Sequence, residues 1–460
     1  MFTTSSPVQT KPSETARALA NLALSLRFDQ IPPEVLAHAK LIVRDTLGVM
    51  LAGSRLPEIR ELARLAPTLG AGTSTLFGTR LKAASHIAAL VNGTGGVSLE
   101  LDEGNQFAIN HPSVHIMPAL WALAEELDCS GAAFLEAFVA AYEIAVRVGR
   151  ATTLRDPVHP FGTHAIVGTA VGAARLLGLD ADMTARAIEL SAGLPIASSQ
   201  MAANSGASVR NLYTGFTNHN GLLAARLALA GFCGEPGALE SVFGAVLGER
   251  FEIATEPRFG AFFINRNYFK IHACSRWNHA PIEAVAEIRA RNAFALADVA
   301  SIEVFTYDPA TRLGGTAVAN AYAAKHSIAF NVAARLAFGS NAFDVYTDEN
   351  VRDPIVVALL GKVAVNEDKA LTALLPGIRA ARVEIGLTSG QRFQARSDRP
   401  VGGFDNPLSA DELRAKFRTL ADQAIRPDAA EALVQEIETL ETAVSLRNVA
   451  GLSGAGSSSH

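Results

Sequence analysis

The first 260 residues or so repeat apolar positions with the period of an α-helix. From Glu14 to about Gly260, Ala and Leu recur three and four residues apart, and Gly or Pro separates the runs. The stretch PPEVLAHAKLIVRDTLGVMLAG is typical, because prolines precede its apolar stripe and Gly53 ends it. Ala-rich runs such as AAFLEAFVAAYEIAVRVG allow helices to approach closely. This part of the chain is predicted to form a large all-helical domain.

The pattern changes after Lys270. The runs VASIEVFTYDP and ARVEIGLTSGQRFQARSD alternate apolar and polar residues over the length of strands, and a Ser-Gly turn signal interrupts the second. Helical patterns cover residues 280–291 and 319–337. Together these elements predict a smaller α+β domain. Ser409 and Glu412 then form the pattern of a capping box, so the chain is expected to return to the helical domain.

The predicted fold is therefore mainly α and has two domains. Residues 1–265 plus 405–460 are assigned to the all-helical domain, and residues 266–404 to the α+β domain. A chain of 460 residues is long enough for two cores. Its content of 49% hydrophobic and 18% charged residues is typical of a globular enzyme or an obligate oligomer. A formal net charge of -5, without clusters of Lys and Arg among aromatic residues, argues against nucleic acid as a partner.

Cysteine usage and the chain ends indicate a cytoplasmic protein. Cys129, Cys233 and Cys274 are odd in number and far apart, which favours a reducing compartment over a disulfide framework or a zinc knuckle. The start MFTTSSPVQTKPSETARALA lacks the basic and apolar regions of a signal peptide, and no run of 18 apolar residues occurs. No membrane partner is expected. The small, polar end GLSGAGSSSH is left out of the fold prediction.

Residues 99–115, LELDEGNQFAINHPSVH, lead from acidic and carboxamide side chains to two histidines. On one helix, His111 and His115 would share a face and could bind a metal. Pro112 favours another arrangement, because proline belongs in the first turn of a helix. His111 would then lie in the loop before the helix, and His115 one turn inside it, facing the core. Without a third ligand in an obvious pattern, no metal site is predicted.

Three further segments place polar, titratable residues at predicted element boundaries, where functional sites are often built. A capping or hydrogen-bonding role is the more frequent one for any single histidine, but several such clusters together indicate a site. The segments are HPFGTH, with His159 and His164; ASVRNLYTGFTNHNG, with Arg210 and Tyr213; and FKIHACSRWNHAPIEA, with Lys270, His272, Ser275, Arg276 and His279.

These residue types favour one class of chemistry. Arg210, Lys270 and the histidines would form a positive pocket for a substrate with two or three carboxylates. Histidine exchanges protons near neutral pH, so proton abstraction next to a carboxylate is the predicted reaction class. The chain has no Gly-rich phosphate loop, no G-x-S-x-G nucleophile elbow and no paired C-x-x-C, and no cofactor is expected.

Seven segments resemble the MmgE/PrpD family in order and spacing over nearly the whole chain. This resemblance implies a large helical domain, a smaller α/β domain, a homodimer and a metal-free site at the domain junction. Members of the family include 2-methylcitrate dehydratase, cis-aconitate decarboxylase and iminodisuccinate epimerase. The segments are RDTLGVMLAG, NGTGGVSLELDEGNQFAINHPSVH, HPFGTHAIVGTAVGAARLLGLD, RNLYTGFTNHNGLLAARLALAGFCGE, KIHACSRWNHAPIEAV, KHSIAFNVAARLAFG and NPLSADELRAKF.

The resemblance also implies roles for single positions. The first acidic residue of the family's DxDD stretch corresponds to Glu100, and the catalytic histidines correspond to His111 and His159. The family's basic positions correspond to Arg210 and Lys270. Further matches are Asp102 and Glu103 in the acidic stretch, Ser275 where relatives have His or Cys, and His279 four residues later.

Three positions depart from the family pattern. Glu100 replaces the usual Asp, Arg210 the usual Lys, and Gly104 a hydroxyl residue. An arginine does not donate a proton near neutral pH, so Arg210 is expected only to bind substrate.

The sequence thus predicts a cofactor-independent lyase, a dehydratase or decarboxylase, acting on a short di- or tricarboxylic acid. His159 is the preferred group for proton transfer at carbon, and His111, oriented by Asp102, for the other proton transfer. An epimerase of an iminodisuccinate-like dicarboxylate and a non-catalytic carboxylate-binding protein remain alternatives. All site residues are expected in one pocket between the domains: His111, His159, Asp102 and Glu100 as catalytic residues, and Arg210, Lys270, Ser275 and His279 as substrate-binding residues.

Overall fold

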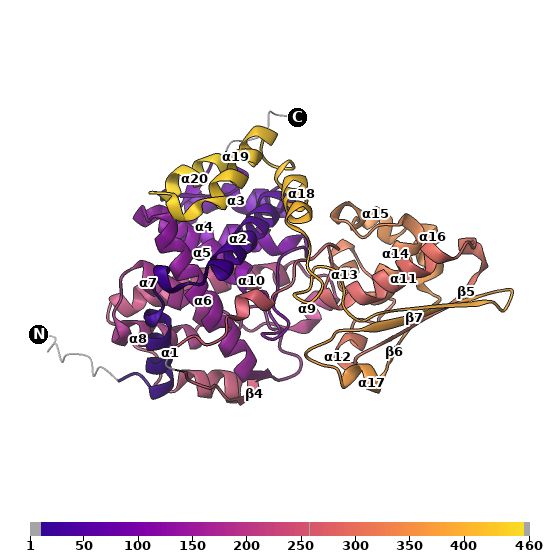
Figure 1. Ribbon diagram of the computed structural model, residues 1–460, viewed down its shortest axis with the longest axis horizontal. Helices are drawn as coiled ribbons and strands as arrows, with labels where there is room; N and C mark the ends of the chain where they lie inside the picture. Colours follow the sequence, from indigo (N-terminus) through magenta and orange to yellow (C-terminus); the bar gives the residue numbers. More distant parts are fainter. Residues whose placement is uncertain (1–10, 257, 455–460) are drawn as a thin grey trace, which may run out of the picture.

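The chain folds into a large helical lobe and a smaller lobe that contains a β-sheet (Figure 1). The computed structural model describes residues 11–256 and 258–454. The expectations for the first ten residues and for the last six therefore lie outside the described residues. The fold is mainly α with a smaller α+β region, which confirms the predicted fold class.

The helical lobe is built from two separate parts of the sequence. In Figure 1 its C-terminal helices, in yellow, lie beside helices from the first part of the chain. The helices are α1 (Glu14–Ser25), α2 (Pro33–Gly53), α3 (Pro57–Leu69), α4 (Ser85–Ser98), α5 (Pro112–Leu127), α6 (Gly131–Ala151), α7 (Ile166–Leu176), α8 (Ala181–Ala192), α9 (Gln200–Asn204) and α10 (Val209–Leu229), then α18 (Ala410–Ala421), α19 (Pro427–Glu438) and α20 (Leu446–Ser453).

Local sequence signals account for the ends of these helices. Pro112 is the first residue of α5, as the His-Pro step predicts, and His111 is its N-cap residue. Ser409 and Glu412 form the predicted capping box at the start of α18. This helix packs against α2, so the chain does return to the helical lobe after the smaller one.

The helical lobe is not purely helical, which corrects the prediction for this region. Two small antiparallel sheets lie in it: β1 (Ser74–Thr75) pairs with β2 (Lys82–Ala83), and β3 (Thr152–Leu154) pairs with β4 (Gly248–Phe251). Strands of two to four residues are too short to show a period of two in the sequence. The strand β3 directly follows α6 and contributes to the cavity described below.

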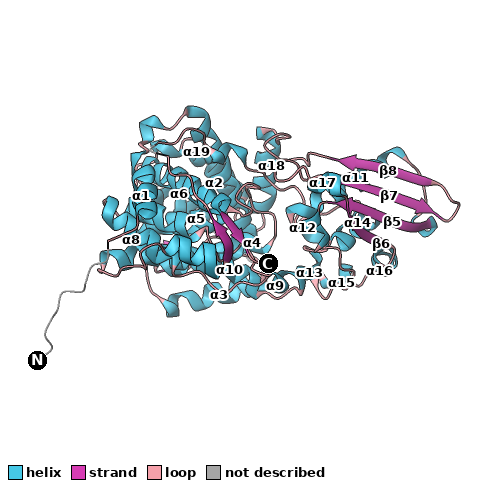
Figure 2. Ribbon diagram, turned by 90° about the horizontal axis from the view of Figure 1, so that it is seen from below, coloured by secondary structure: helices cyan, strands magenta, loops and turns pink. Residues whose placement is uncertain are grey.

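The smaller lobe is a four-stranded sheet with helices against it (Figure 2). The strand order is β6-β5-β7-β8; β5 runs parallel to β6 and antiparallel to β7, and β7 runs antiparallel to β8. The elements are α11 (His279–Arg291), β5 (Val299–Thr306), α12 (Asp308–Thr311), α13 (Ala321–Ala324), α14 (Ile328–Phe338), α15 (Asp348–Val351), α16 (Pro354–Leu360), β6 (Val363–Glu367), α17 (Lys369–Thr372), β7 (Ala381–Leu387) and β8 (Arg392–Ser397).

The single helix predicted over residues 319–337 is wrong, because the chain breaks between α13 and α14. Ser327 ends the break and caps α14 by accepting a hydrogen bond from the backbone N–H of Phe330. The backbone oxygen of Lys325 accepts hydrogen bonds from the N–H of Ser275 and from the side chain of Asn278. Contacts from outside the helix therefore hold residues 325–327 in a loop.

Each lobe has its own apolar core. The largest cluster of buried apolar residues draws on α2, α5, α6 and the C-terminal helices, while a second joins the sheet to α11 and α14. The second cluster also includes Val49, Ala52, Leu99, Leu101 and Leu420 of the helical lobe, so it continues across the junction. The division into residues 1–265 plus 405–460 and residues 266–404 stays a prediction. In the part of the chain that the structure describes, every helix is too short or too polar to cross a lipid bilayer.

Candidate active site

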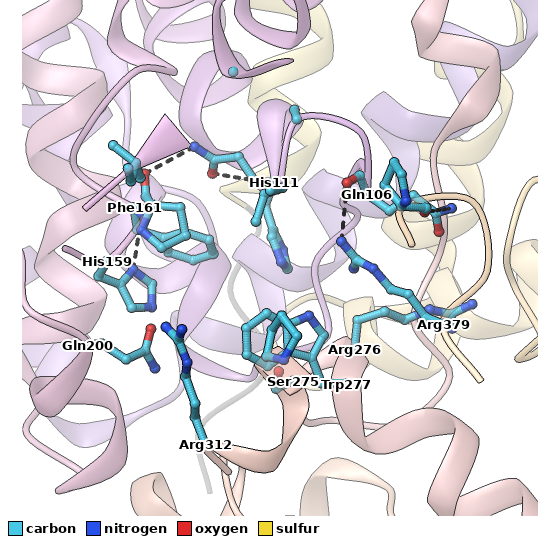
Figure 3. Close-up of a pocket in the computed structure, with 18 of the residues that line it drawn as sticks. Gln106, His111, His159, Phe161, Gln200, Ser275, Arg276, Trp277, Arg312 and Arg379 are labelled. Carbon is cyan, nitrogen blue, oxygen red and sulfur yellow. Dashed lines mark hydrogen bonds between the residues drawn. The ribbon is translucent and has the colours of Figure 1, made fainter. Parts of the chain in front are cut away.

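A cavity of about 500 Å³ opens between the two lobes. Five of the eight predicted site residues line it: Glu100, His111, His159, Arg210 and Ser275. Asp102, Lys270 and His279 are buried behind these lining residues. Figure 3 shows that the cavity residues come from both lobes.

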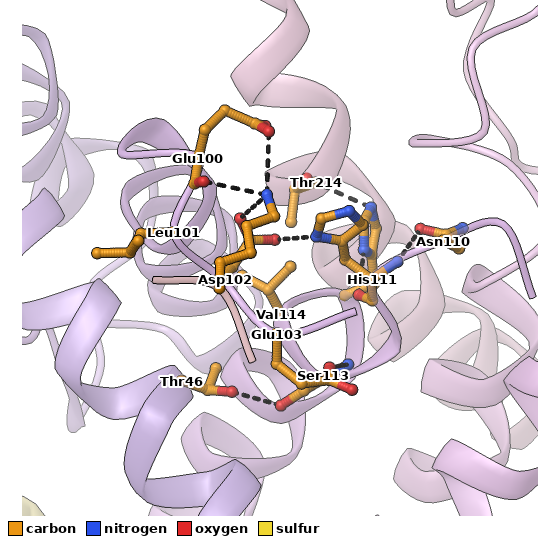
Figure 4. Close-up of polar contacts among 12 residues, drawn as sticks. Thr46, Glu100, Leu101, Asp102, Glu103, Asn110, His111, Ser113, Val114 and Thr214 are labelled. Carbon is orange, nitrogen blue, oxygen red and sulfur yellow. Dashed lines mark hydrogen bonds and ion pairs between the residues drawn. The ribbon is translucent and has the colours of Figure 1, made fainter. Parts of the chain in front are cut away.

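His111 forms a dyad with Asp102 at the inner end of the cavity (Figure 4). Both residues belong to the loop between α4 and α5, and His111 Nδ1 lies 2.6 Å from Asp102 Oδ2. The other carboxylate oxygen of Asp102 lies 3.5 Å from Lys270 Nζ. The Tyr268 hydroxyl lies 3.2 Å from His111 Nε2.

This arrangement leaves His111 Nε2 as the reactive nitrogen. Burial would raise the pKa of Asp102, but the charges of Lys270 and His111 outweigh it and lower the pKa below its usual value. The ionised Asp102 therefore accepts the Nδ1–H of His111. Burial lowers the pKa of His111 itself, so its Nε2 carries a lone pair near neutral pH and can accept a proton.

The neutral ring of His159 is the opposite tautomer to that of His111. Its Nδ1 accepts a hydrogen bond of 3.0 Å from the backbone N–H of Phe161, so the proton of the neutral ring is on Nε2. Burial and the positive charge of Arg210 hold the pKa of His159 well below its usual value. A neutral imidazole with a proton on the free nitrogen donates a hydrogen bond but does not accept a proton there. This geometry favours His111 over His159 as the base, contrary to the preference derived from the sequence.

Glu100 neutralises the basic residues that the sequence assigned to the substrate. It forms an ion pair with Arg210, and Lys270 Nζ lies 3.1 Å from its Oε2. Lys270 also donates a hydrogen bond of 3.1 Å to the backbone oxygen of Glu100. Burial would raise the pKa of Glu100, but Arg210 and Lys270 hold the pKa well below its usual range. The charges of Glu100 and Asp102 therefore balance those of Arg210 and Lys270.

Two more arginines supply positive charge to the cavity. Arg276 was noted in the sequence within a cluster of polar residues but was not assigned to the substrate, and Arg379 was not predicted. Both line the cavity. Arg276 is buried, and its guanidinium donates hydrogen bonds of 2.7 and 2.8 Å to the backbone oxygens of Pro400 and Val401. Arg379 donates one of 3.2 Å to the backbone oxygen of Gln106. Among the described residues, no carboxylate lies within 4.0 Å of either guanidinium.

The other predicted substrate-binding residues take different positions. Ser275 is half-buried and lines the cavity. His279 is the first residue of α11, and its Nδ1 lies 3.1 Å from Arg276 Nη1. It is fully buried and does not line the cavity, so it can position Arg276 rather than touch a ligand.

His326, also missed, reaches the cavity because the chain breaks between α13 and α14. Burial lowers its pKa to about 3, so it is neutral near pH 7. Arg312 lines the cavity as well; in Figure 3 its side chain points toward His159 and Gln200. The sequence signal for His326 was the Lys-His-Ser step within an apolar run, whereas Arg379 had no local signal.

His115 is not part of the cavity, as the prediction of a core-facing side chain requires. It is fully buried, and its Nδ1 lies 2.7 Å from the backbone oxygen of His111. Within residues 11–256 and 258–454, no three His, Cys, Asp or Glu side chains are grouped so that they could hold a metal ion. The lining residues instead offer guanidinium and imidazole groups, which suit an anionic organic ligand.

Comparison with known proteins matches both lobes to one family. The model of the MmgE/PrpD N-terminal domain matches residues 17–249, and that of the MmgE/PrpD C-terminal domain matches residues 272–442. The cis-aconitate decarboxylase-like protein oryM of Aspergillus oryzae is 25% identical over 94% of this chain and 96% of its own length. Cis-aconitate decarboxylase of Aspergillus terreus is 25% identical over 92% and 91%, and that of Mus musculus 25% identical over 92% and 90%. The chain therefore belongs to the MmgE/PrpD family.

Proposed function

We propose that the protein is a lyase that acts on a short di- or tricarboxylic acid by proton transfer at a carbon next to a carboxylate. The observation that carries this proposal is the His111–Asp102 dyad, whose Nε2 faces a cavity lined by two arginines, Arg276 and Arg379, that form no ion pair among the described residues. The similarity to cis-aconitate decarboxylases supports it and favours decarboxylation over dehydration.

Arg276 and Arg379 are the proposed carboxylate ligands. A guanidinium can form two parallel hydrogen bonds with a carboxylate, and neither group has a competing carboxylate of the protein within ion-pair distance among the described residues. Arg276 is also fixed by two backbone oxygens and by the Tyr268 ring, whose centroid lies 4.9 Å from its Cζ. A fixed cation binds a substrate carboxylate without first losing side-chain freedom.

The proton-transfer step is assigned to His111. In a decarboxylation, the bond to the departing carboxylate breaks, carbon dioxide leaves, and the electron pair stays on the substrate carbon. The bound polyanion raises the pKa of His111, so His111 enters this reaction with a proton on Nε2 and delivers it to that carbon. In a dehydration, Nε2 would instead remove the proton, and hydroxide would leave.

His159 and Tyr268 are assigned to charge stabilisation. Both carry a hydrogen-bond donor that faces the cavity, and a fixed donor that meets developing negative charge contributes about 3 kcal/mol in comparable sites. The role proposed for Glu100 is to hold Arg210 and Lys270 in place. No step requires a metal or an organic cofactor, so activity is expected to persist in EDTA.

A panel of acids in deuterated water tests the proposal. The protein is incubated with cis-aconitate, citrate and 2-methylcitrate, and NMR follows substrate loss and deuterium at carbon. We expect one of these acids to lose carbon dioxide or water. A decarboxylation product should carry deuterium at carbon, whereas a dehydration should release substrate hydrogen and leave deuterium only in substrate formed by the reverse reaction. His111→Asn should abolish the change, and His219→Asn, a half-buried control outside the cavity, should preserve it. Deuterium uptake with inversion, without loss of carbon dioxide or water, would indicate an epimerase; binding without reaction would indicate a non-catalytic protein.

A further inference from the structure

The residues that line the inner end of the cavity differ in type from those that line its outer part. His111, His159, Arg210 and Arg276 are buried at its inner end. Toward the solvent the lining mixes polar residues, such as Thr153, Gln200 and Arg312, with a group of apolar residues. The apolar group consists of exposed Ile109 and Pro376 and half-buried Leu154, Trp277 and Leu375. A short, fully ionised acid would occupy only the inner end. The outer part has the composition of a subsite for an apolar group.

Ile109 is held in this outer part at the expense of backbone strain. Its φ is 51°, in the left-handed region that β-branched residues rarely adopt, and its side chain is 54% exposed. Two backbone hydrogen bonds between Asn105 and Asn110 close the loop that carries it. The same loop ends at His111. The chain therefore fixes an exposed apolar side chain two residues from the proposed proton donor, in a conformation that glycine would adopt more easily.

The opposite wall is tied to this loop. Gln106 Nε2 donates hydrogen bonds of 2.9 Å to the backbone oxygens of Pro376 and Gly377, which places Leu375 and Pro376 beside the loop of Ile109. On another side, Arg312 forms an ion pair of 3.2 Å with Asp156, in the segment that follows Leu154. The apolar residues thus lie at the rim of the cavity, and both lobes contribute to this rim.

The volume of the cavity exceeds what a short acid needs. A six-carbon tricarboxylate occupies roughly 200 Å³, on a scale where a liquid water takes about 30 Å³. The cavity measures about 500 Å³. The difference could hold a chain of several carbons against the apolar part of the lining.

We propose that the substrate carries an apolar substituent, an alkyl chain of about three to six carbons, that lies against Ile109, Leu154, Trp277 and Leu375. This inference rests on the proposed function, because the carboxylates of the same molecule bind at Arg276 and Arg379. Each methylene that leaves water for this rim tightens binding about fourfold, so the rim selects long-chain acids over the unsubstituted parent.

Unreactive analogues test this inference by binding alone. Propane-1,2,3-tricarboxylate and its methyl, propyl and pentyl derivatives are titrated into the protein by calorimetry. We expect affinity to rise about fourfold for each added methylene until the rim is filled. Ile109→Ser should lose affinity progressively as the chain lengthens. Val444→Ser, at a site 81% exposed and outside the cavity, is the matched control and should give the wild-type series.

The outcomes separate this inference from the proposed function. Affinity that stays flat or falls with chain length overturns the apolar subsite, while turnover of an acid in deuterated water leaves the lyase proposal standing. A rising series that Ile109→Ser leaves unchanged overturns the placement at this rim. If no acid binds and none reacts, both proposals fail.

Discussion

His111 and His159 contact the same ring, yet their chemistry differs. The centroid of Phe161 lies 4.8 Å from that of His111 and 4.9 Å from that of His159. An aspartate holds one imidazole through its Nδ1–H, while a backbone N–H holds the other through its Nδ1 lone pair. Opposite tautomers therefore face the cavity, and a hydrogen-bond donor and a proton-transfer group lie side by side.

Glutamine substitutions should separate these two roles. A glutamine amide can replace the N–H donor of His159 but cannot exchange a proton with carbon. We expect His111→Gln to lower kcat by about 10²- to 10⁴-fold with little change in KM, and His159→Gln to retain much more activity. Steady-state kinetics on the acid identified by NMR measures both. Equal losses of kcat in the two variants would contradict the assignment.

A second buried acid, Glu103, should control stability rather than catalysis. It accepts a hydrogen bond of 2.5 Å from the Tyr142 hydroxyl and one of 3.3 Å from the N–H of Ser113. Burial raises the pKa of Glu103 from 4.5 to about 8, so the folded protein favours the neutral acid. The resulting stabilisation is complete below about pH 4.5 and is lost as the pH rises through 8.

Glu103→Gln should remove this dependence on pH. For the parent protein, Glu103 should lower the free energy of unfolding by up to about 1.4 kcal/mol per pH unit between these two pH values. Urea unfolding of both proteins at pH 6 and pH 9 measures the difference. The variant should gain stability relative to the parent at pH 9; equal changes in the two midpoints would show that Glu103 does not titrate in this range.

The sequence could identify most of these residues and indicated Asp102 as the partner of His111, but it did not indicate the partner of His159 or the tautomer of either ring. His111, Asp102 and His159 stood out because polar groups at element boundaries are conspicuous in an apolar chain. The tautomers depend on a backbone N–H and on an aspartate nine residues away, which no spacing rule specifies. Arg379 was missed, and Arg276 was noted but given no role, because an arginine is notable only when its carboxylate partner is absent, and ion pairs are visible only in the fold.

At the scale of elements, the break between α13 and α14 matters most for the site. It brings His326 to the cavity, and it lets Lys325 donate a hydrogen bond of 2.7 Å from Nζ to the backbone oxygen of Ser98, at the end of α4. Burial lowers the pKa of Lys325 to about 8. A continuous helix would direct these two side chains elsewhere, so the break links the smaller lobe to the helix that precedes Glu100.

Ser327→Ala tests this role of the break. Ser327 caps α14, and its hydroxyl also donates a hydrogen bond of 3.0 Å to the backbone oxygen of Gly315. We expect the variant to lose about 1 kcal/mol of stability and to show a raised KM because His326 moves. Ser409→Ala removes a cap of the same kind from α18 and is the control. It should lose similar stability without a change in KM, and identical kinetics in both variants would contradict the prediction.

Helices and strands were predicted correctly where a regular apolar spacing extends over many residues. They were predicted wrongly where contacts with distant parts of the chain determine the local structure. The helix at 280–291 and the strands around the Ser-Gly turn are confirmed as α11, β7 and β8. The strand β6 was missed because its five residues, VAVNE, are mostly exposed or half-buried and show little apolar pattern. The break at Ser327 was missed because the apolar spacing continues across it.

For the whole molecule, we predict a homodimer. Val209 and Phe216 lie two turns apart on the same face of α10 and remain 47% and 37% exposed, so they form an apolar stripe on one face of this helix. Light scattering after gel filtration should give twice the chain mass of 48.4 kDa. Phe216→Glu should shift the mass toward a single chain, whereas Phe232→Glu, on the loop after α10, should not. A single-chain mass for the parent protein would contradict the prediction.

The two-lobe organisation was predictable from the change in the spacing of apolar residues near residue 270. Most of the chain before this point has the spacing of helices, and strand-like alternation appears only after it. The placement of the cavity between the lobes was implied by family resemblance. Its volume and its apolar rim could not be predicted, since they depend on how the loops at residues 105–111 and 375–379 meet.

The distribution of the site over two lobes has an evolutionary consequence. The dyad and His159 belong to the helical lobe, whereas Arg276, Arg379 and part of the apolar rim belong to the other. Mutations in the loops around residues 309–313 and 375–379 can therefore alter which acid is accepted without disturbing the proton-transfer pair. Related proteins can therefore come to accept different acids through substitutions in the smaller lobe, while selection preserves the proton-transfer residues of the helical lobe.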